Sequence, residues 1–239
     1  MTGRIDVHGH LLPGLDDGSR SYIESIEIAR RMAQAGYSHL TCSPHIWPGK
    51  VYAPSFIVER VALLQAKLDE AGVAITLIAG GELNLIDLDL FSMADEEIPT
   101  YGMARRHVLF DFWSDELPDD YWERIDRLRA LGATPIQAHP ERIAAFQYQP
   151  ELIDELAARG VLLQGNLQCF SDKAGTRMRM CAERWLAAGR YFVLGSDLHR
   201  LDTLKIRLDG LQRATDIVGE AEVDRLTITN AAVVTGVPS

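Results

Sequence analysis

Short apolar segments alternate with amphipathic segments along most of the chain. Val108-Leu109-Phe110 and Phe192-Val193-Leu194 are near-continuous apolar runs, typical of strands that are buried on both faces. Residues 21–35 instead place apolar side chains at helical spacing, and Gly36 follows where a helix C-cap is expected. Alternation of this kind predicts parallel strands connected by helices.

About seven β/α units are predicted in this way. The predicted strands are Arg4–His8, His39–Ser43, Val73–Ala79, His107–Phe112, Thr134–Ala138, Val161–Gly165 and Tyr191–Gly195. The predicted helices are Ser21–Ala35, Ser55–Ala71, Asp119–Leu131, Glu151–Arg159 and Lys173–Ala188. The absence of a low-complexity stretch or a Pro/Gly-rich linker favours one domain spanning residues 1–239.

Histidine or a carboxylate follows nearly every predicted strand. A closed barrel brings all strand exits to one rim, whereas an open doubly wound sheet concentrates its site at one switch point. We therefore expect an α/β fold, a distorted (β/α)7-type barrel, with a metal site at the C-terminal ends of its strands. The candidate ligands are His8, His10, Asp17, His45, Glu82, Asp111, His139, Asp197 and His199.

These residue types suit borderline-to-hard divalent metals, because imidazole and carboxylate are present and cysteine is not. His8 and His10 flank one glycine and point to the same side of an extended chain, as do Asp197 and His199. The two pairs meet if the barrel closes. Asp111 interrupts an apolar run, where a carboxylate is costly to bury unless it is paired or binds a metal.

Several polar residues have a structural reading instead. His39 and His107 begin predicted strands, at the opposite rim from the candidate site, so we expect them to be structural or surface residues. Of Asp16 and Asp17, one is expected to serve the turn and the other a metal. Glu82 follows two glycines, and its alternative is a helix-capping acid.

Composition narrows the partner classes. The chain has 239 residues, 47% of them hydrophobic, and a formal charge of −10, which argues against nucleic acid or an anionic membrane surface as partner. Bound divalent cations could still make the pocket locally positive. Cys42, Cys169 and Cys181 fit neither a disulfide framework nor a thiolate cluster, so a cytoplasmic location is expected. We find neither a targeting segment nor a membrane-spanning run, and the oligomeric state stays open.

Aromatic residues also occur near the predicted strand ends. Trp47, Phe112, Trp113 and Phe170 could line a pocket for a ring, although aromatic side chains at strand ends are at least as often part of the core.

The stretch from Ile5 to Ser21, IDVHGHLLPGLDDGSRS, resembles the opening motif of the bacterial tyrosine phosphatases of the polymerase-and-histidinol-phosphatase (PHP) superfamily, which are associated with capsule and exopolysaccharide synthesis. The resemblance continues, in order and at comparable spacing, through Ser43-Pro44-His45, Gly81-Glu82, Leu109–Phe112, Ala138–Arg142 and Gly195–His199. The tail Leu226–Ala231 is similar to the final helix of that family.

This resemblance implies the PHP fold and three divalent metal ions, usually manganese, with iron or zinc as alternatives. The nine candidate ligands would hold them, with Glu82 as the bridging carboxylate. Arg142 matches an arginine that contacts the phosphate. The implied substrate is phosphotyrosine on a bacterial tyrosine kinase that regulates polysaccharide assembly.

Two positions depart from the family pattern. Asp111 stands where the family usually has glutamate, which shortens the reach of the carboxylate by one methylene. Leu204 stands near the position of a second phosphate-binding arginine, so that Arg200 or Lys205 would have to substitute for it. Phosphotyrosine selectivity depends on this second departure.

The mechanism we hypothesise is attack on phosphorus by a metal-activated hydroxide, with Arg142 neutralising charge on the phosphate oxygens. His199 or its neighbour Asp197 would assist protonation of the leaving phenolate. Three alternatives stay open: a small-molecule phosphatase acting on histidinol phosphate or a nucleotide, a metal-dependent amidohydrolase, and a catalytically inactive protein that docks the kinase.

Overall fold

The strands form a parallel arrangement. The computed structural model describes residues 3–238 except 105, 115, 172 and 173. The strands of this part of the chain lie in the orders β1-β2-β4 and β3-β5-β6-β7-β8-β9, and all paired neighbours run parallel. Their bounds are β1 Arg4–Asp6, β2 Tyr37–Cys42, β3 His45–Ile46, β4 Thr76–Ala79, β5 Glu82–Asn84, β6 His107–Asp111, β7 Thr134–Ala138, β8 Leu162–Asn166 and β9 Val193–Gly195.

The two sheets are parts of one barrel. After Ser43-Pro44, β2 is followed directly by β3, and after Gly80-Gly81, β4 is followed directly by β5. The Gly80 amide donates to the Cys42 carbonyl at 3.0 Å, which keeps the interrupted strands side by side. The nine segments therefore act as seven barrel strands, because two pairs of segments are each halves of one strand.

The barrel closes just beyond the C-terminal ends of β1 and β9. Gly9 and Leu198 form a parallel bridge there. The His10 amide donates to the Leu198 carbonyl at 3.0 Å, and the Asp197 amide donates to the His8 carbonyl at 2.8 Å. The expected distorted α/β barrel is confirmed, and its closure joins the two predicted ligand pairs.

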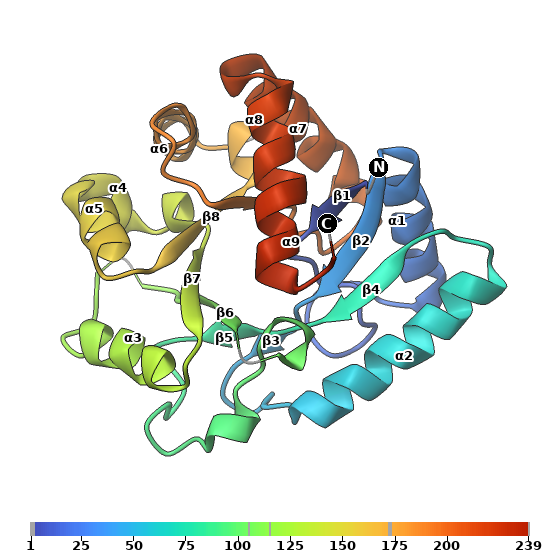
Figure 1. The fold of residues 1–239 in the computed structure, drawn as a ribbon, viewed down its shortest axis with the longest axis horizontal. Helices are drawn as coiled ribbons and strands as arrows, with labels where there is room; N and C mark the ends of the chain where they lie inside the picture. The colour runs from blue at the N-terminus through green and yellow to red at the C-terminus, as the bar shows by residue number, and fades with distance from the viewer. Residues whose placement is uncertain (1–2, 105, 115, 172–173, 239) are drawn as a thin grey trace.

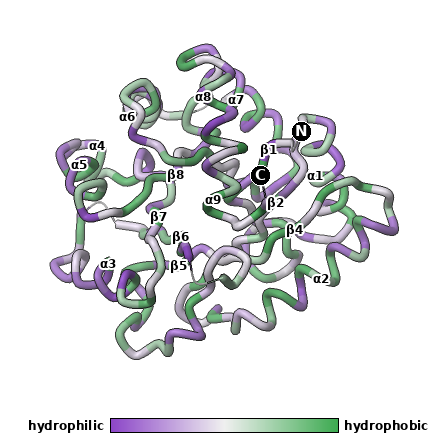
Figure 2. The backbone as a smooth tube through the Cα atoms, in the orientation of Figure 1, coloured by the Kyte–Doolittle hydropathy of each residue, from purple (hydrophilic) through white to green (hydrophobic). Residues whose placement is uncertain are grey.

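Helices surround the strands (Figure 1). Their bounds are α1 Tyr22–Gln34, α2 Pro54–Glu70, α3 Tyr121–Ala130, α4 Ala144–Tyr148, α5 Glu151–Ala158, α6 Thr176–Ala187, α7 Leu204–Val218, α8 Glu220–Asp224 and α9 Asn230–Thr235. The connecting helical turns include η3 Pro140–Arg142, η4 Leu167–Phe170 and a π-helical turn at Arg225–Thr229. Hydrophilic segments lie along outer helices such as α3 and α5 (Figure 2). None of the helices in the described ranges is long and apolar enough to cross a membrane.

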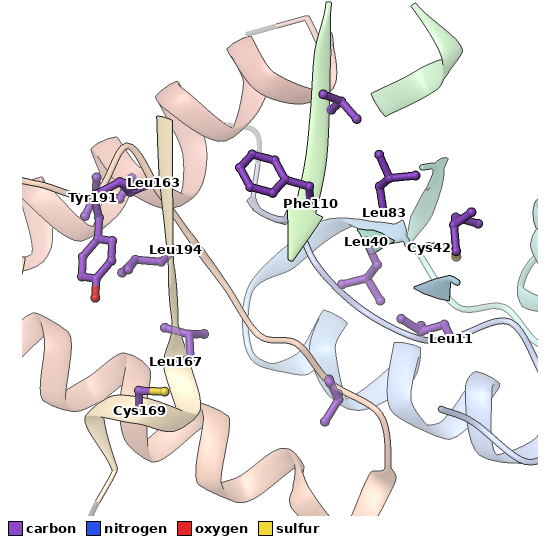
Figure 3. Packing of buried hydrophobic residues seen from close by; sticks show 14 of the residues in the cluster. Leu11, Leu40, Cys42, Leu83, Phe110, Leu163, Leu167, Cys169, Tyr191 and Leu194 are labelled. Carbon is purple, nitrogen blue, oxygen red and sulfur yellow. The ribbon is translucent and has the colours of Figure 1, made fainter. Parts of the chain in front are cut away.

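Apolar side chains pack in two layers. Ile5, Val7, Leu109, Ile136 and Val193 belong to an inner cluster that also includes residues of α9. Side chains at alternate strand positions, such as Val108 and Phe110, belong to a larger outer cluster between the strands and the helices. Figure 3 shows part of this outer packing around Leu40, Leu83 and Phe110. Burial on both faces explains why these strands were near-continuous apolar runs.

The observed elements differ from the predicted ones at a few places. His39 is the third residue of β2 and does not begin it, and β3 and β5 were not predicted. The predicted start of one helix, Lys173, lies outside the described residues, and α6 begins at Thr176. Helix α7 was not assigned from the sequence, and the predicted tail helix is the π-helical turn followed by α9.

Candidate metal centre

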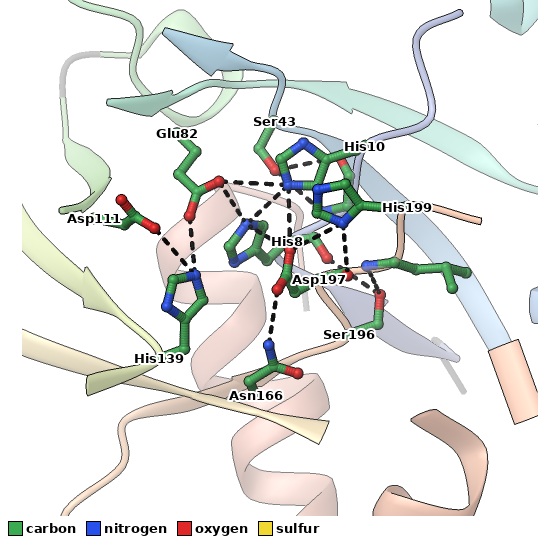
Figure 4. Close-up of polar contacts among 12 residues, drawn as sticks. His8, His10, Ser43, Glu82, Asp111, His139, Asn166, Ser196, Asp197 and His199 are labelled. Carbon is green, nitrogen blue, oxygen red and sulfur yellow. Dashed lines mark hydrogen bonds and ion pairs between the residues drawn. The ribbon is translucent and has the colours of Figure 1, made fainter. Parts of the chain in front are cut away.

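The nine predicted ligand residues lie at the C-terminal end of the barrel, and Figure 4 shows His8, His10, Glu82, Asp111, His139, Asp197 and His199 converging. They come from seven points around the rim: His8 and His10 follow β1, Asp17 lies between β1 and α1, His45 is in β3, Glu82 is in β5, Asp111 ends β6, His139 follows β7, and Asp197 and His199 follow β9. Parallel strands in a closed barrel explain how residues so far apart in sequence come together.

Glu82 is at the centre of the cluster and is buried. Its Oε2 atom lies 2.9 Å from His45 Nδ1 and 3.2 Å from His8 Nε2. Its Oε1 atom lies 3.1 Å from His139 Nε2. The two oxygens of one carboxylate thus face two different sets of imidazoles, which is the arrangement a bridging ligand needs.

Asp197 occupies the opposite side of the same cluster. Its Oδ1 atom lies 3.3 Å from His10 Nε2 and 3.3 Å from His199 Nδ1. Asp197 and His139 both adopt left-handed backbone conformations, with φ of 49° and 30°. Such conformations are unfavourable for residues other than glycine and cluster at functional sites, where the surrounding structure holds them.

Asp111 reaches the edge of the cluster despite its shorter side chain. Its Oδ2 atom lies 3.6 Å from His139 Nε2. Burial, with Glu82 nearby, raises the pKa of the Asp111 carboxyl well above its ordinary value. In the absence of a cation this carboxylate would be costly to keep ionised.

Asp16 and Asp17 take different positions. Asp16 Oδ2 lies 2.8 Å from His10 Nδ1, and it also accepts a hydrogen bond from the His45 amide at 3.1 Å. Asp17 Oδ1 instead lies 3.4 Å from His199 Nε2, and 66% of the Asp17 side chain is exposed. Asp16 therefore orients a neighbouring imidazole, whereas Asp17 faces the open side of the cluster.

Polar residues behind the cluster fix the imidazole tautomers. The Gln164 Oε1 atom is 2.9 Å from His8 Nδ1, and Asp16 holds the equivalent atom of His10. The Nε2 atoms of His8 and His10 are then left facing each other at 3.2 Å. Partners of this kind are usual behind metal-bound histidines.

Two donors hold the far oxygen of Asp197. Asn166 Nδ2 donates to Asp197 Oδ2 at 2.8 Å, and Arg142 donates to the same oxygen at 2.7 Å. The backbone of Asn166 is in turn fixed by Glu141, whose Oε1 accepts the Asn166 amide at 2.7 Å. Sequence reasoning missed Gln164 and Asn166, although a polar side chain within the apolar strand Val161–Gly165 or at its end was an available signal.

The buried carboxylates of the cluster favour positive charge beside them. Burial lowers the pKa of His8, but the carboxylates of Glu82 and Asp197 outweigh it and raise the pKa to about 9. Burial, helped by the nearby His10, lowers the pKa of His199 to about 4. Imidazoles with raised and with lowered pKa values therefore lie side by side, and the buried Glu82 Oε2 makes no well-aligned hydrogen bond with the imidazole nitrogens around it.

The donor atoms fit divalent metals. Four groups of three ligand atoms each lie within 4.8 Å of one another: His10, His45 and His199; His8, His10 and Glu82; His8, His139 and Asp197; and Glu82, Asp111 and His139. Among the described residues, none of these groups includes a cysteine, and Cys42, Cys169 and Cys181 are free thiols. Imidazole and carboxylate donors of this kind suit manganese, iron or zinc.

The residues proposed for a second phosphate contact are engaged elsewhere. Arg200 Nε donates to Glu24 Oε1 at 2.9 Å. Lys205 is exposed and pairs with Asp209 at 2.7 Å. Leu204 is buried, and with Lys205 and Arg31 it lines a cleft that includes none of the nine ligand residues.

A separate cleft of about 360 Å³ opens beside the cluster. It is lined by Asp111, Phe112, Trp113, Ser114, His139, Arg142 and Ile143. The Arg142 side chain is 47% exposed, although one of its guanidinium nitrogens is bound to Asp197. A phosphate bound in this cleft would therefore lie close to both the proposed ligand residues and an arginine.

The comparisons with known proteins agree with this arrangement. A family model described as capsular polysaccharide synthesis, CpsB/CapC, matches residues 4–235. The tyrosine-protein phosphatase CpsB of Streptococcus agalactiae serotype V is 25% identical over 238 residues, which cover 95% of this chain and 96% of the relative. The tyrosine-protein phosphatase YwqE of Bacillus subtilis is 25% identical over 201 residues, covering 83% of this chain and 78% of the relative.

Solved structures share the fold. A structure from work on YwqE of Bacillus subtilis and CpsB of Streptococcus pneumoniae, described as metal-dependent tyrosine phosphatases, matches with a TM-score of 0.86 at 24% identity. That match covers 98% of this chain and 95% of the other. A phosphotriesterase homology protein from Escherichia coli matches with a TM-score of 0.63 at 12% identity, covering 98% and 99% of the two chains.

Proposed function

The chain belongs to the CpsB/CapC family of capsular polysaccharide synthesis, and on that premise we propose that it is a metal-dependent protein-tyrosine phosphatase. The observation that carries the proposal is the position of Arg142, which lines one cleft together with the cluster residues Asp111 and His139. Curated relatives that span nearly the whole chain are named tyrosine-protein phosphatases. The proposed unit is a single catalytic domain.

The proposed cofactor is three divalent ions, most simply manganese, with iron or zinc as alternatives. The nine ligand residues would hold them, and Glu82, whose oxygens face two sets of imidazoles, would bridge. Bound ions of this type supply Lewis-acid chemistry: they polarise phosphate oxygens and make a water molecule nucleophilic near neutral pH. No cysteine nucleophile is required for such a reaction.

Arg142 would bind the phosphate. Its guanidinium is fixed on one side by Asp197 Oδ2 at 2.7 Å and lines the cleft. A positively charged donor at this place stabilises the charge that develops on the phosphate oxygens in the transition state. Arg200 stays a candidate for a second contact, and it would have to leave Glu24 to make one.

His199 and Asp197 are better suited to ligand roles than to proton transfer. Burial and the nearby His10 lower the pKa of His199 to about 4, so its imidazole is neutral at pH 7 and has no spare proton. The carboxyl of Asp197 has a pKa well below its ordinary value, because the His8 and His10 imidazoles outweigh its burial. A phenolate leaving group needs little help from an acid.

The proposed substrate is phosphotyrosine on a bacterial tyrosine kinase that regulates capsule or exopolysaccharide synthesis. This assignment follows the family and the names of the relatives. A kinase of that kind presents its phosphotyrosines inside the cell, so the proposal includes a cytoplasmic location.

The test is hydrolysis by metal-stripped protein resupplied with manganese, iron or zinc. The substrates are para-nitrophenyl phosphate and a tyrosine-phosphorylated peptide, beside a serine-phosphorylated peptide and histidinol phosphate. We expect metal-restored release of phosphate from phosphotyrosine, and a loss of that release on adding a chelator. Release of phosphate from histidinol phosphate alone would support the metal mechanism and would identify the substrate as a small molecule instead of a phosphoprotein. Activity that survives metal removal would overturn the mechanism.

A further inference from the structure

Two tryptophans lie beside the cluster of proposed ligand residues. The Trp47 ring stacks on the imidazole of His45 with ring centroids 4.7 Å apart. The Trp113 ring meets Trp47 edge-on at 4.8 Å and His45 edge-on at 5.6 Å. Phe112 and Phe170, the other two aromatic candidates from the sequence, are buried in the outer core. Phe112 lines the cleft of about 360 Å³ but is 1% exposed, whereas Trp113 is the aromatic residue of this set that presents a large exposed face to it.

Trp113 is held at a fixed orientation. Its Nε1 atom donates to Asp111 Oδ2 at 3.1 Å, so the ring is tied to a residue of the metal cluster. The contact with Trp47 supports it from a second direction. An indole held by two partners offers a rigid surface that loses little conformational freedom when a ligand binds.

Trp113 is exposed although its orientation is fixed. Its side chain is 56% exposed. Clefts lie against it: the one of about 360 Å³ that contains Arg142 and His139, and another of about 480 Å³ lined by Trp47, Pro48, Asn84 and Asp87. In the first cleft, Trp113 and Ile143 form an apolar wall close to the charged groups.

We propose that Trp113, supported by Trp47, forms an aryl-binding subsite that receives the ring of an aryl phosphate while the phosphate lies at Arg142. The assignment rests on the proposed phosphatase function for the position of the phosphate. The subsite favours aryl phosphates, because stacking or edge contact with the indole adds binding free energy for an aromatic ring. An alkyl phosphate such as phosphoserine has no ring to place there.

The subsite also accounts for selectivity without a second arginine. Leu204 stands near the expected position of that arginine, is buried and lines a different cleft. Ring recognition by Trp113 would then supply discrimination that phosphate contacts alone do not supply. Aromatic pairs contribute enough to change affinity by roughly two- to twelvefold.

The experiment compares binding of phenylphosphonate and methylphosphonate, which are not hydrolysed, to the metal-loaded protein by calorimetry. Trp113→Ala is the test variant, and Trp113→Phe keeps a ring at the position. The matched control is Phe91→Ala, since Phe91 is 52% exposed and lines neither cleft. We expect Trp113→Ala to reduce the preference for phenylphosphonate by roughly two- to twelvefold, whereas Trp113→Phe keeps most of the preference and Phe91→Ala keeps all of it.

Kinetic measurements on the same proteins separate this inference from the proposed function. If the unaltered protein hydrolyses phosphotyrosine and Trp113→Ala keeps the full phenylphosphonate preference, the subsite is wrong and the phosphatase function stands. If no phosphate ester is hydrolysed but the preference is present and depends on Trp113, the subsite stands and the proposed function falls. An equal loss of binding for both phosphonates in Trp113→Ala would show damage to the Asp111 contact and overturn the ring-binding role.

Discussion

Asp197 divides its two carboxylate oxygens between the imidazoles and two donors behind them. Oδ1 faces His10 and His199, whereas Oδ2 accepts from Asn166 and Arg142. The left-handed backbone at Asp197 makes this orientation possible, and the two donors help to hold it. Asn166 is thus a positioning residue, because it touches a proposed ligand and lies outside the ligand set.

We expect Asn166→Ala to weaken metal binding by about 10- to 100-fold, since partners of this kind orient metal ligands. The Asn166 side chain is buried and its amide is 2.8 Å from Asp197 Oδ2, so alanine would leave that oxygen with Arg142 alone. The measurement is metal content and affinity by competition with a chelator of known strength. Circular dichroism would establish that the variant is folded.

Gln212→Ala is the control for this prediction. Gln212 is exposed on α7, where it donates to Asp216 at 2.9 Å. We expect it to bind metal as the unaltered protein does. Unchanged metal affinity in a folded Asn166→Ala variant would show that Arg142 alone orients Asp197.

Residue types could be predicted here better than their individual positions. Strand exits and the H-x-H and D-x-H spacings were enough to select a set of side chains that the structure brings together. The choice between Asp16 and Asp17 depended on backbone geometry, since adjacent carboxylates in a turn look alike in sequence. Gln164 and Asn166 were missed because their role depends on which proposed ligand each one contacts, and the sequence does not show those contacts.

At the scale of elements, helix α7 approaches the barrel through a glycine. A methyl group built on Gly210 would overlap the Leu167 carbonyl oxygen in η4. Helix α7 also holds the segment after β9, since Arg207 donates to the Asp197 carbonyl at 3.1 Å. The position of α7 therefore affects the geometry of the ligand loop.

We expect Gly210→Ala to lower the free energy of unfolding by about 1–3 kcal/mol, as overpacking usually does. The sign of the change in the free energy of unfolding is diagnostic, because a glycine-to-alanine change in an unobstructed helix would stabilise the helix by about 1 kcal/mol. Thermal unfolding should show a lower Tm, by about 2–4 °C for each kcal/mol. Gly175→Ala is the control, since a methyl group there meets nothing within 4 Å. A raised Tm in Gly210→Ala would contradict the close packing.

Element boundaries show where local sequence signals fail. Pro44 and the pair Gly80-Gly81 indicated strand ends, but the chain resumes its pairing after each and forms β3 and β5. Proline and glycine interrupt a strand locally, whereas the neighbouring strand decides whether pairing resumes. Helix α7 was not predicted, although Leu204, Leu208 and Leu211 recur there at helical spacing.

At the scale of the whole molecule, barrel closure and the proposed metal site occupy the same place. The bridge between Gly9 and Leu198 lies between His8 and His10 on one strand exit and between Asp197 and His199 on the other. The buried Asp6 reinforces this junction by accepting the Ser196 amide at 2.8 Å. The overall fold could be predicted because alternating β and α segments leave few parallel arrangements that bury all strands.

Metal removal should therefore destabilise the whole barrel as well as abolish activity. A metal at 100 times its dissociation constant stabilises the folded state by about 2.7 kcal/mol. For a chain of this size each kcal/mol shifts Tm by about 2–4 °C, so chelation is expected to lower Tm by roughly 5–11 °C. His10→Ala removes a proposed ligand at the closure and should abolish most of the Tm increase that added manganese gives.

Differential scanning calorimetry with and without chelator, followed by manganese titration, would measure this coupling. His39→Ala is the control, since His39 lies in β2 and belongs to none of the four ligand groups found among the described residues. It should keep the full manganese-dependent increase. Equal Tm values before and after metal removal, in protein shown to bind manganese, would mean that the barrel closes without its metals and that hydrogen bonds such as that from Asp197 to His8 suffice.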